Sequence, residues 1–514
     1  MKKKFYIESV FLLLLGSVTS LSLPPYNLTV INFFTFSILF YFLFKKKVSK
    51  KETKFPFFYG WLFGFGYFLS NMYWIPISLS FDDDFKSLIP LALISIPAFL
   101  SLFYGLIFYF FFIFKQRKLI NSFLFFSLTF GVIEFLRGSI LTGFPWNLIV
   151  YSFANHHEFL SVTSIIGTYG LNLFCISFFT CPALFILGNK RKKLRVPIFF
   201  FLSYVIFYFY GSIYQDKFEK SKNYQYEYII RIIGSNISLD RFYFNIDTVS
   251  VIEDLIDVSN PTLSEKMIFV WPEGILPDVT QEELTEYKNL FEENFSENHI
   301  LIMGVNSHSK NGKPKKYFNS LSVFNNQVEL LNTYNKIKLV PFGEFLPFEN
   351  FLNKVGLRSI TNFNQSFSKG KHRKIIKIDK KDFSLKFLPL ICYEIIYSGE
   401  LYKQQDFDLI INISEDGWFG RSIGPKQHFV HSIFRAVESG KYVLRSANNG
   451  AAAIINPLGF VEGKVKYGDS GFIDLKEIKK IQPTIFSKYG NKIFVLLTLL
   501  YIFLIFSFNK IKDE

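Results

Sequence analysis

The chain places long apolar runs at its two ends and a long polar stretch between them. An apolar run of about 18 or more residues is typical of a membrane span, because roughly 20 helical residues cross the hydrocarbon of a bilayer. The runs therefore predict a polytopic α-helical membrane domain of about eight spans, near residues 6–23, 28–44, 56–79, 88–114, 119–141, 159–187, 196–214 and 491–508.

The polar stretch, residues 220–488, has the length of an ordinary folded domain. Apolar segments such as 226–236 and 299–307 indicate buried strands, whereas 248–260 and 425–443 have helical spacing. Strands and helices that alternate in this way are typical of a layered α/β fold. We therefore expect three parts: a transmembrane domain at 1–219, an α/β domain at 220–488, and an eighth span with its tail at 489–514.

The composition supports this division. Half of the 514 residues are hydrophobic, and 67 of them are Phe. Between and beside the apolar runs, basic residues crowd alternate loops, such as 45–54 and 190–195, while another loop carries Asp82–Asp84. Because basic loops stay on the cytoplasmic side, both termini are expected inside and residues 220–488 outside. This distribution argues against nucleic acid as a partner.

The first apolar run has an alternative interpretation. "MKKK" followed by "FLLLLGSVTSL" is also the pattern of a cleaved signal peptide, which would leave seven spans and the same alternation of loops.

Cysteine is rare. Cys175 and Cys181 lie in the sixth apolar run, and Cys392 is the single cysteine of the exported part, so that part can form no internal disulfide. A solitary thiol in an oxidising compartment is either buried packing or is retained for its chemistry.

His428 and His431 have helical spacing without an evident third ligand, so we expect no metal. No phosphate-binding loop suggests a cofactor.

Three ionisable residues follow or end predicted strands. Glu273 ends "IFVWPE", Lys336 lies in the apolar "TYNKIKLV", and Cys392 ends "LPLIC". A nearby ammonium lowers the pKa of a thiol, a carboxylate can act as general base, and the same ammonium can stabilise an oxyanion. Together the three would make an acyl-transfer site. Taken singly, a surface glutamate, a snorkelling lysine and a core cysteine are the alternatives.

Segments around these residues resemble those of a known superfamily. "WPEG" (271–274), "YNKIKLVPFGE" (334–344) and "LICYE" (390–394) resemble the catalytic segments of the nitrilase superfamily. With about eight spans around them, the chain resembles its membrane-bound apolipoprotein N-acyltransferase family. The resemblance extends to "SNMYW" (70–74), "GFPW" (143–146), "DGWFG" (416–420), "GPKQH" (424–428), "RAVESG" (435–440) and "RSANNG" (445–450).

The resemblance implies an exported nitrilase-like catalytic domain, an αββα sandwich, with a Glu–Lys–Cys triad. It makes Glu273 the general base, Lys336 the oxyanion-stabilising cation and Cys392 the nucleophile. Glu344 would position the lysine, and Tyr393 and Glu394 would support the nucleophile.

The implied activity belongs to the last step of lipoprotein maturation in a bacterial inner (cytoplasmic) membrane. A membrane phospholipid would donate an acyl chain to Cys392 as a thioester, which then passes to the N-terminal amine of an S-diacylglyceryl-cysteine lipoprotein. We expect no cofactor, no metal, no nucleic acid and a monomer. The alternatives are a membrane-tethered amidase or hydrolase with the same triad, and a non-catalytic receptor or transporter.

Some positions depart from the family's pattern. The first strand ends in Gly234-Ser235-Asn236 rather than Gln-Gly-Asn, Tyr243 stands where a tryptophan is usual, and Glu415 stands where an asparagine is usual.

A further hypothesis concerns the apolar segment after Glu344. Its large side chains are expected to form an arm that dips into the membrane interface: Phe345, Leu346, Phe348, Phe351 and Leu352.

Overall fold

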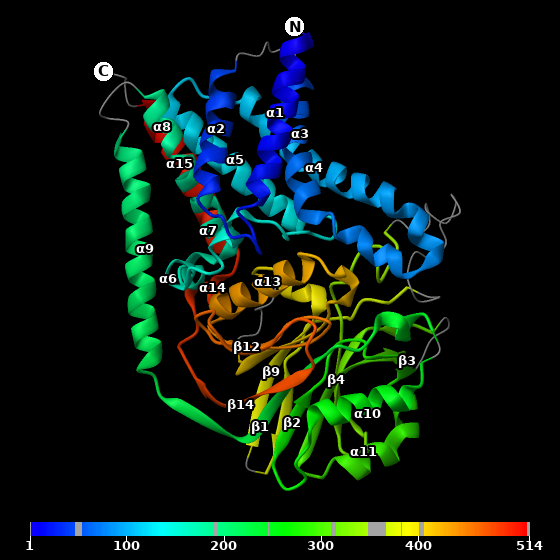
Figure 1. Cartoon of the computed structure of the whole chain (residues 1–514). Helices are drawn as coiled ribbons and strands as arrows, with labels where there is room; N and C mark the ends of the chain where they lie inside the picture. Colours follow the sequence, from blue (N-terminus) through cyan, green and yellow to red (C-terminus); the bar gives the residue numbers. More distant parts are fainter. Residues whose placement is uncertain are drawn as a thin grey trace.

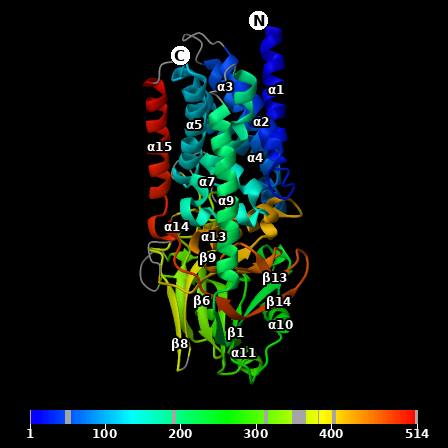
Figure 2. The ribbon, with the colours of Figure 1, turned by 90° about the vertical axis from the view of Figure 1, so that its left-hand side faces the viewer.

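The protein consists of a bundle of helices stacked on a domain built from strands (Figure 1). The computed structural model describes residues 2–46, 54–188, 194–244, 246–309, 315–347, 366–381, 383–399 and 406–510. Both termini lie at the end of the bundle that is farthest from the strands (Figure 1). A view turned by 90° shows the same two stacked parts (Figure 2).

Every predicted apolar run coincides with a helix in the described part of the chain. The helices are α1 (Lys2–Ser20), α2 (Ile31–Lys45), α3 (Lys54–Met72), α4 (Ile89–Ile113), α5 (Leu119–Ser139), α7 (Thr163–Thr180) with α8 (Pro182–Leu187), α9 (Arg195–Glu219) and α15 (Lys492–Lys510). Within the described ranges, five helical stretches are long and apolar enough to cross a membrane: 83–113, 119–139, 163–187, 195–219 and 492–510. The helices α1, α2 and α3 fall outside that set, and α2 has only 15 residues.

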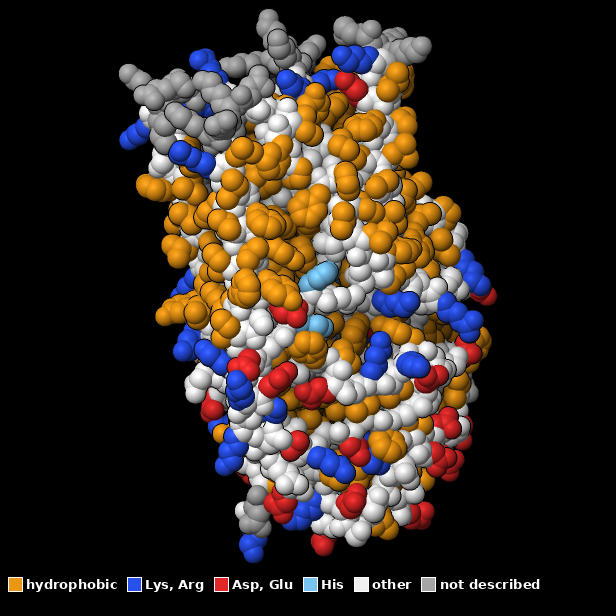
Figure 3. Space-filling view, turned by 60° about the vertical axis from the view of Figure 1, so that its left-hand side comes forward, with side chains coloured by type: hydrophobic (Ala, Val, Ile, Leu, Met, Phe, Trp, Pro, Cys, Tyr) orange, Lys and Arg blue, Asp and Glu red, His pale blue; other side chains and the backbone are white. Residues whose placement is uncertain are grey.

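The outer surface of the bundle is apolar. Hydrophobic side chains cover most of the helical part on the face shown in Figure 3, while charged side chains gather on the strand domain and at the opposite end. Many large side chains of α9 and α15 are exposed. Among them are Phe199, Ile206, Phe209, Leu496, Phe503 and Phe506. An apolar band of this kind marks a surface that faces lipid.

Short helices line the side of the bundle that faces the strands. They are η1 (Ile75–Phe81), η2 (Asp83–Leu88), η3 (Ile149–Phe153) and α6 (His157–Leu160). Helix α7 is broken at Gly167, where φ is +70° and a Cβ would lie 2.0 Å from the ring of Phe486. Phe486 belongs to α14 (Ile485–Tyr489), so glycine at this break allows the segment before α15 to pack closely on α7.

The strand domain is one continuous hydrogen-bonded network of strands. Its main path runs in the order β7-β6-β4-β2-β1-β11-β10-β9-β8. The strands of this path are β1 (Asn223–Ser235), β2 (Met267–Val270), β4 (His299–His308), β6 (Ser320–Asn325), β7 (Leu330–Asn335), β8 (Ile376–Lys380), β9 (Phe383–Ile391), β10 (Leu409–Glu415) and β11 (Tyr442–Asn448). Off the path lie β3 (Leu276–Thr280), β5 (Tyr317–Phe318), β12 (Ala452–Ile455), β13 (Val461–Val465) and β14 (Gly471–Lys479).

Parallel pairing dominates the centre of this network. Strand β1 pairs in parallel with β2 and β11, β2 with β4, and β10 with both β9 and β11. The carboxyl ends of these strands therefore meet at one edge, which is where open α/β sheets place their binding sites.

Helices cover the strands on two sides. Helices α10 (Thr248–Ser259) and α11 (Lys288–Asn294) lie on the outside, while α13 (Gly424–Ser439) lies between the strands and the helical bundle (Figure 1). The apolar residues of the domain form one cluster between strands, another under α10 and α11, and a third that is continuous with the core of the helical bundle. The expected layering of helices and strands is confirmed.

The proposed membrane-dipping arm receives little support from the described residues. Leu346 is buried, so it is not available to enter a membrane, and this part of the expectation is wrong. Phe345 is half-buried. Phe348, Phe351 and Leu352 lie outside the described residues.

Candidate active site

Glu273, Lys336 and Cys392 each follow closely on the end of a strand. Glu273 comes three residues after β2, Lys336 directly follows β7, and Cys392 opens the short helix η7 (Cys392–Ile396) after β9. Gly304 of β4 passes so close to the Glu273 loop that a Cβ there would lie 2.5 Å from the Glu273 Cα. Glycine at this point therefore lets the loop lie flat against β4.

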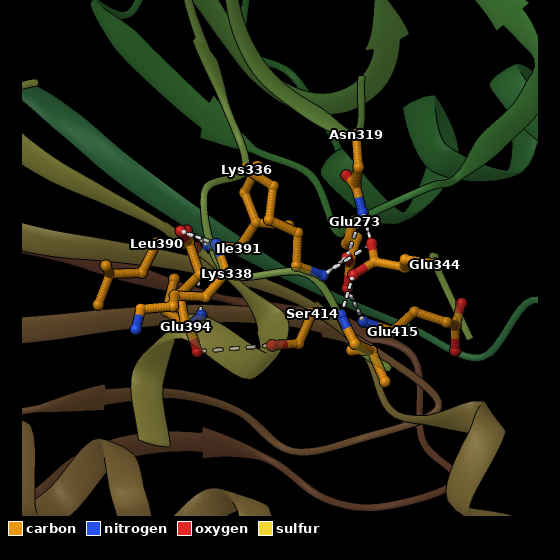
Figure 4. A network of polar contacts seen from close by, with 12 residues as sticks. Glu273, Asn319, Lys336, Lys338, Glu344, Leu390, Ile391, Glu394, Ser414 and Glu415 are labelled. Carbon is orange, nitrogen blue, oxygen red and sulfur yellow. Dashed lines mark hydrogen bonds and ion pairs between the residues drawn. The ribbon is translucent and has the colours of Figure 1, made fainter. Parts of the chain in front are cut away.

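Lys336 is held between two carboxylates. Its Nζ donates to Oε1 of Glu273 at 2.9 Å and to Oε1 of Glu344 at 3.0 Å (Figure 4). The side-chain amide of Asn319 donates to the same two oxygens, at 2.7 Å each. The second oxygen of Glu344 accepts the backbone N–H of Val340 at 2.8 Å, which orients this carboxylate toward the lysine.

This ion cluster is almost closed to solvent. The Lys336 side chain is 1% exposed. Burial alone would lower the pKa of Lys336, but Glu273 and Glu344 raise it well above its ordinary range, so the amine stays charged. Burial raises the pKa of Glu344, whereas Lys336 lowers it. A cation fixed in a site of low polarity is suited to stabilise a developing oxyanion.

Cys392 lies in a strained turn directly after β9. Its φ is +46°, in the left-handed region that non-glycine residues rarely occupy, and such strain persists mainly where the surroundings impose it. Burial and the charge of Glu273 raise the pKa of the Cys392 thiol well above its ordinary value, while Lys336 lowers it. The resting group is therefore the neutral thiol, which needs a base before it can attack.

Glu394 stabilises the turn that carries Cys392 by accepting hydrogen bonds. Its Oε2 accepts the N–H of Ile391, at the end of β9, at 2.9 Å. Its Oε1 accepts hydrogen bonds from four more donors: the hydroxyl of Tyr334 and the N–H of Ile337, both at 3.0 Å or less, the N–H of Lys338 at 3.3 Å and Arg373 Nη2 at 3.2 Å. One buried carboxylate thus joins the turn of Cys392 to the segment that carries Lys336.

Tyr393 connects the same turn to the helical bundle. Its hydroxyl donates to the carbonyl of Gly143 at 3.0 Å, and the hydroxyl of Tyr397 donates to the carbonyls of Thr142 and Gly143 at 3.0 and 3.1 Å. Gly143 belongs to the loop after α5 and has a φ of +75°. The loop is held from its other side by Arg137, whose Nη1 donates to the carbonyl of Phe144 at 2.5 Å.

Gln427 of α13 forms a second link between the two parts. Its side-chain oxygen accepts from the indole N–H groups of Trp74 and Trp146, at 3.1 and 2.9 Å. Its side-chain amide lies near the carbonyl of Pro24 and the side chain of Asn71. The "GPKQH" and "GFPW" segments thus meet in the structure.

His428 and His431 do not share a ligand. His428 Nδ1 lies 2.9 Å from Asp416 Oδ1, in a buried cluster where Arg445 donates to both oxygens of Asp416 at 2.9 and 3.0 Å. His431 instead packs against the rings of Tyr151 and Trp146. Among the described residues, no group of three or more His, Cys, Asp and Glu side chains is arranged to hold a metal ion.

The structure therefore joins three of the six predicted site residues, Glu273, Lys336 and Glu344, in one hydrogen-bonded cluster. Glu394 connects the turn of Cys392 and Tyr393 to the segment that carries Lys336 through backbone N–H groups. Sequence reasoning missed Asn319, which bridges Glu273 and Glu344, and the carbonyl of Gly143. Asn319 directly precedes β6, in a segment that reads as an ordinary hairpin, and a backbone carbonyl carries no side-chain signal at all.

Two family models match the chain. Residues 15–181 match the apolipoprotein N-acyltransferase N-terminal domain, and residues 262–474 match the carbon-nitrogen hydrolase family. The second match identifies the strand domain as nitrilase-like, and it contains every predicted site residue.

Two relatives that match most of the chain are both apolipoprotein N-acyltransferases. An apolipoprotein N-acyltransferase of Brucella melitensis is 31% identical over 478 residues, which cover 89% of this chain and 87% of the relative. An apolipoprotein N-acyltransferase of Rhodopseudomonas palustris is 29% identical over 501 residues, which cover 94% of this chain and 92% of the relative.

Solved structures similar to the chain include an amidase from Nesterenkonia sp. AN1, at 11% identity and a TM-score of 0.32, covering 48% of this chain and 92% of the amidase.

The identity and coverage of the whole-length relatives, with both family models in the expected order, decide the classification. The chain belongs to the apolipoprotein N-acyltransferase family, membrane-bound acyltransferases of the nitrilase superfamily.

Proposed function

We propose that this protein transfers a fatty acyl chain from a membrane phospholipid to the N-terminal amine of an S-diacylglyceryl-cysteine lipoprotein, through a thioester on Cys392. The relatives' name supplies the class of acceptor. The observation that carries the mechanism is the buried lysine between Glu273 and Glu344, whose charge lowers the pKa of the thiol of the strained Cys392 against the effect of burial.

In the first half-reaction, Glu273 takes the proton of the Cys392 thiol as the sulfur attacks an ester carbonyl of the phospholipid. Lys336 stabilises the oxyanion that forms. The C–O bond then breaks, Glu273 returns its proton to the leaving alkoxide, and a lysophospholipid departs. The products are a thioester and a neutral lysophospholipid hydroxyl, so protons balance.

In the second half-reaction, the free amine of the lipoprotein attacks the thioester carbonyl. Glu273 takes a proton from the attacking amine, and the Cys392 sulfur leaves. The same proton returns to the sulfur, which restores the thiol and releases the amide. A two-step reaction of this kind has ping-pong kinetics.

The arrangement of the two parts suits lipid substrates. Extracting an acyl chain into water would cost about 0.8 kcal/mol for each CH₂. A site built against the end of a helical bundle avoids that cost. We place residues 1–219 and 489–514 in a bacterial inner membrane with both termini in the cytoplasm, and residues 220–488 outside; the termini at the far end of the bundle support this orientation (Figure 1).

Mass spectrometry of the purified protein, expected to be a monomer, tests the proposal. Incubation with phospholipid vesicles should add the mass of one fatty acyl group to Cys392, and Cys392→Ala should abolish the addition. A lipopeptide with a free N-terminal amine should then remove the group as an amide. Rapid release of free fatty acid without an amine acceptor would instead support the amidase alternative.

A further inference from the structure

A second buried ion pair lies next to Glu273. Arg241 and Glu415 form a salt bridge from Arg241 Nη2 to Glu415 Oε2, and both side chains are 2% exposed. The same Glu415 oxygen accepts the side-chain amide of Asn448 at 2.7 Å. Its other oxygen accepts the N–H of Gly417 at 2.8 Å. Glu415 and Asn448 end β10 and β11, Gly417 lies two residues beyond β10, and Arg241 lies in the short helix η5 (Leu239–Phe242) after β1.

This pair is bonded to the proposed base through the backbone. The N–H of Glu415 donates to Oε2 of Glu273 at 3.0 Å, while the other Glu273 oxygen is occupied by Lys336 and Asn319 (Figure 4). The Glu415 side chain closes a turn onto Gly417 directly after β10, so it helps to hold the end of the strand from which this N–H projects. The orientation of Glu273 thus depends on a side chain that Arg241 holds.

Arg241 also organises the loop after β1. Its Nη1 donates to the carbonyls of Ile237 and Ser238, at 3.2 and 2.7 Å, and its guanidinium lies over the ring of Phe242, 4.5 Å from the centroid. Phe242 packs on Trp418 at 4.8 Å, and Trp418 meets Phe81 of η1 at 6.0 Å. The loop therefore lies in an aromatic cluster that joins the strand domain to the helical bundle.

The positive charge of Arg241 opposes the effect of burial on Glu415. Burial raises the pKa of Glu415, whereas Arg241 lowers it and favours the charged carboxylate. The neighbouring charged groups are Glu273, Lys336, Glu344 and Asp416, and Asp416 is already paired with Arg445. Without Arg241, burial would favour the protonated form of Glu415, and the carboxylate that accepts from Gly417 and Asn448 would be lost.

We propose that Arg241 and Glu415 are positioning residues for Glu273, which hold its second oxygen in place and keep the charge around it balanced. This inference rests on the proposed role of Glu273 as general base. It also accounts for Glu415 at a position where the family's pattern has asparagine, because the buried Arg241 pairs with the acidic side chain.

The test measures acylation of Cys392 in full-length protein in phospholipid vesicles, as a function of pH, for Arg241→Met, Glu415→Gln and the double variant. In Arg241→Met the buried Glu415 loses the cation that keeps it charged and takes up a proton, so its bonds to Gly417 and Asn448 weaken and the rate falls while the acid limb of the rate profile stays close to that of the wild-type protein. In Glu415→Gln the unpaired Arg241 cation favours ionised Glu273, so the limb moves to lower pH. We expect each single variant to lose about 10- to 100-fold in rate.

The double variant removes both charges, so its acid limb should return to that of the wild-type protein and its rate should recover. Arg231→Met with Asp474→Asn is the matched control, since that pair joins β1 and β14 away from Glu273 through two contacts of 2.7 and 2.8 Å. The control should leave the acid limb unmoved.

Two outcomes would overturn the inference: a Glu415→Gln variant whose acid limb does not move to lower pH, or a double variant that remains as impaired as the worse single variant. If Arg241→Met does not fold, the direction of the shift in Glu415→Gln decides alone. Wild-type protein that forms no acyl-enzyme would refute the proposed function instead, so the two failures are distinguishable.

Discussion

The hydroxyl of Tyr393 donates a hydrogen bond to the backbone carbonyl of Gly143, at 3.0 Å and across 250 positions of sequence. Tyr393 is the neighbour of Cys392, and Gly143 belongs to the helical bundle. The turn that presents the thiol is therefore held by both parts of the protein. Neither part alone contains the complete geometry of the site.

Tyr393→Phe should slow acylation of Cys392 by about tenfold, because removing one hydrogen bond of about 1 kcal/mol lets the strained turn move and small displacements at a reacting atom are costly. Acylation in phospholipid vesicles, followed by mass spectrometry, measures the rate. Tyr397→Phe removes a hydroxyl that shares the Gly143 carbonyl but lies farther along the turn. An equal or larger loss in Tyr397→Phe would contradict the special role of Tyr393.

Glu273→Gln should make Cys392 easier to ionise while it blocks acyl transfer. The charge of Glu273 raises the pKa of the thiol, so its removal lowers that pKa and more thiolate is present at a given pH. Lys336→Met should act in the opposite direction, since the lysine lowers the same pKa. The pH dependence of alkylation by iodoacetamide, followed by mass spectrometry, measures both shifts. No shift in either variant would show that burial alone governs the thiol, and shifts of equal sign would contradict the opposite effects of the two charges.

Glu394→Gln should destabilise the strand domain by about 3 kcal/mol, because an amide cannot accept hydrogen bonds from all five donors that surround this buried carboxylate. Denaturant unfolding in detergent measures the change. Glu329→Gln on the exposed hairpin between β6 and β7 makes the same chemical change and should be nearly neutral. Equal effects of the two variants would contradict a structural role for the Glu394 charge.

The stability of the protein should fall below pH 6.5, in part through His431. Burial lowers the pKa of His431 well below its ordinary value of 6.5, and the nearby charges of Arg435 and His428 lower it further. The unfolded chain therefore binds this proton first, so the contribution is complete above pH 6.5. It is lost as pH falls toward the folded pKa, by about 1.4 kcal/mol for each pH unit.

Thermal unfolding between pH 5 and pH 7.5 checks this expectation. His431→Leu removes one titrating group and should flatten the dependence, although His428, whose pKa burial also lowers, still contributes. A variant whose unfolding temperature depends on pH as steeply as that of the wild-type protein would exclude His431 as a source.

The positions of the helices and of the candidate site residues were predictable for a physical reason. Apolar runs are long enough to be recognised without tertiary information, and Glu273, Lys336 and Cys392 interrupt or end apolar segments where a charge or thiol is unusual. Parallel strands then bring their carboxyl ends together, so residues separated by about 60 positions meet without any local signal.

Contacts that depend on packing between distant segments were not predictable. Asn319 and Gly143 join the site only because β6 and the loop after α5 happen to lie there. Leu346 reads as an exposed apolar residue in sequence and is buried by neighbours that no periodicity reveals. Glu415 was recognised as a departure, but its partner Arg241 became visible only once β1 and β10 were placed in space.

The helices α9 and α15 lead into and out of the strand domain, one at each end of it. The second is fastened to the bundle by hydrogen bonds such as that from Asn121 to the carbonyl of Ile505 and that between Ser177 and Tyr501. A domain anchored at two points cannot swing as a lid on a single stalk. Under the proposed function, its height above the bilayer is therefore constant, donor and acceptor reach Cys392 by lateral diffusion within the leaflet, and turnover should respond to the fluidity and crowding of the surrounding lipid.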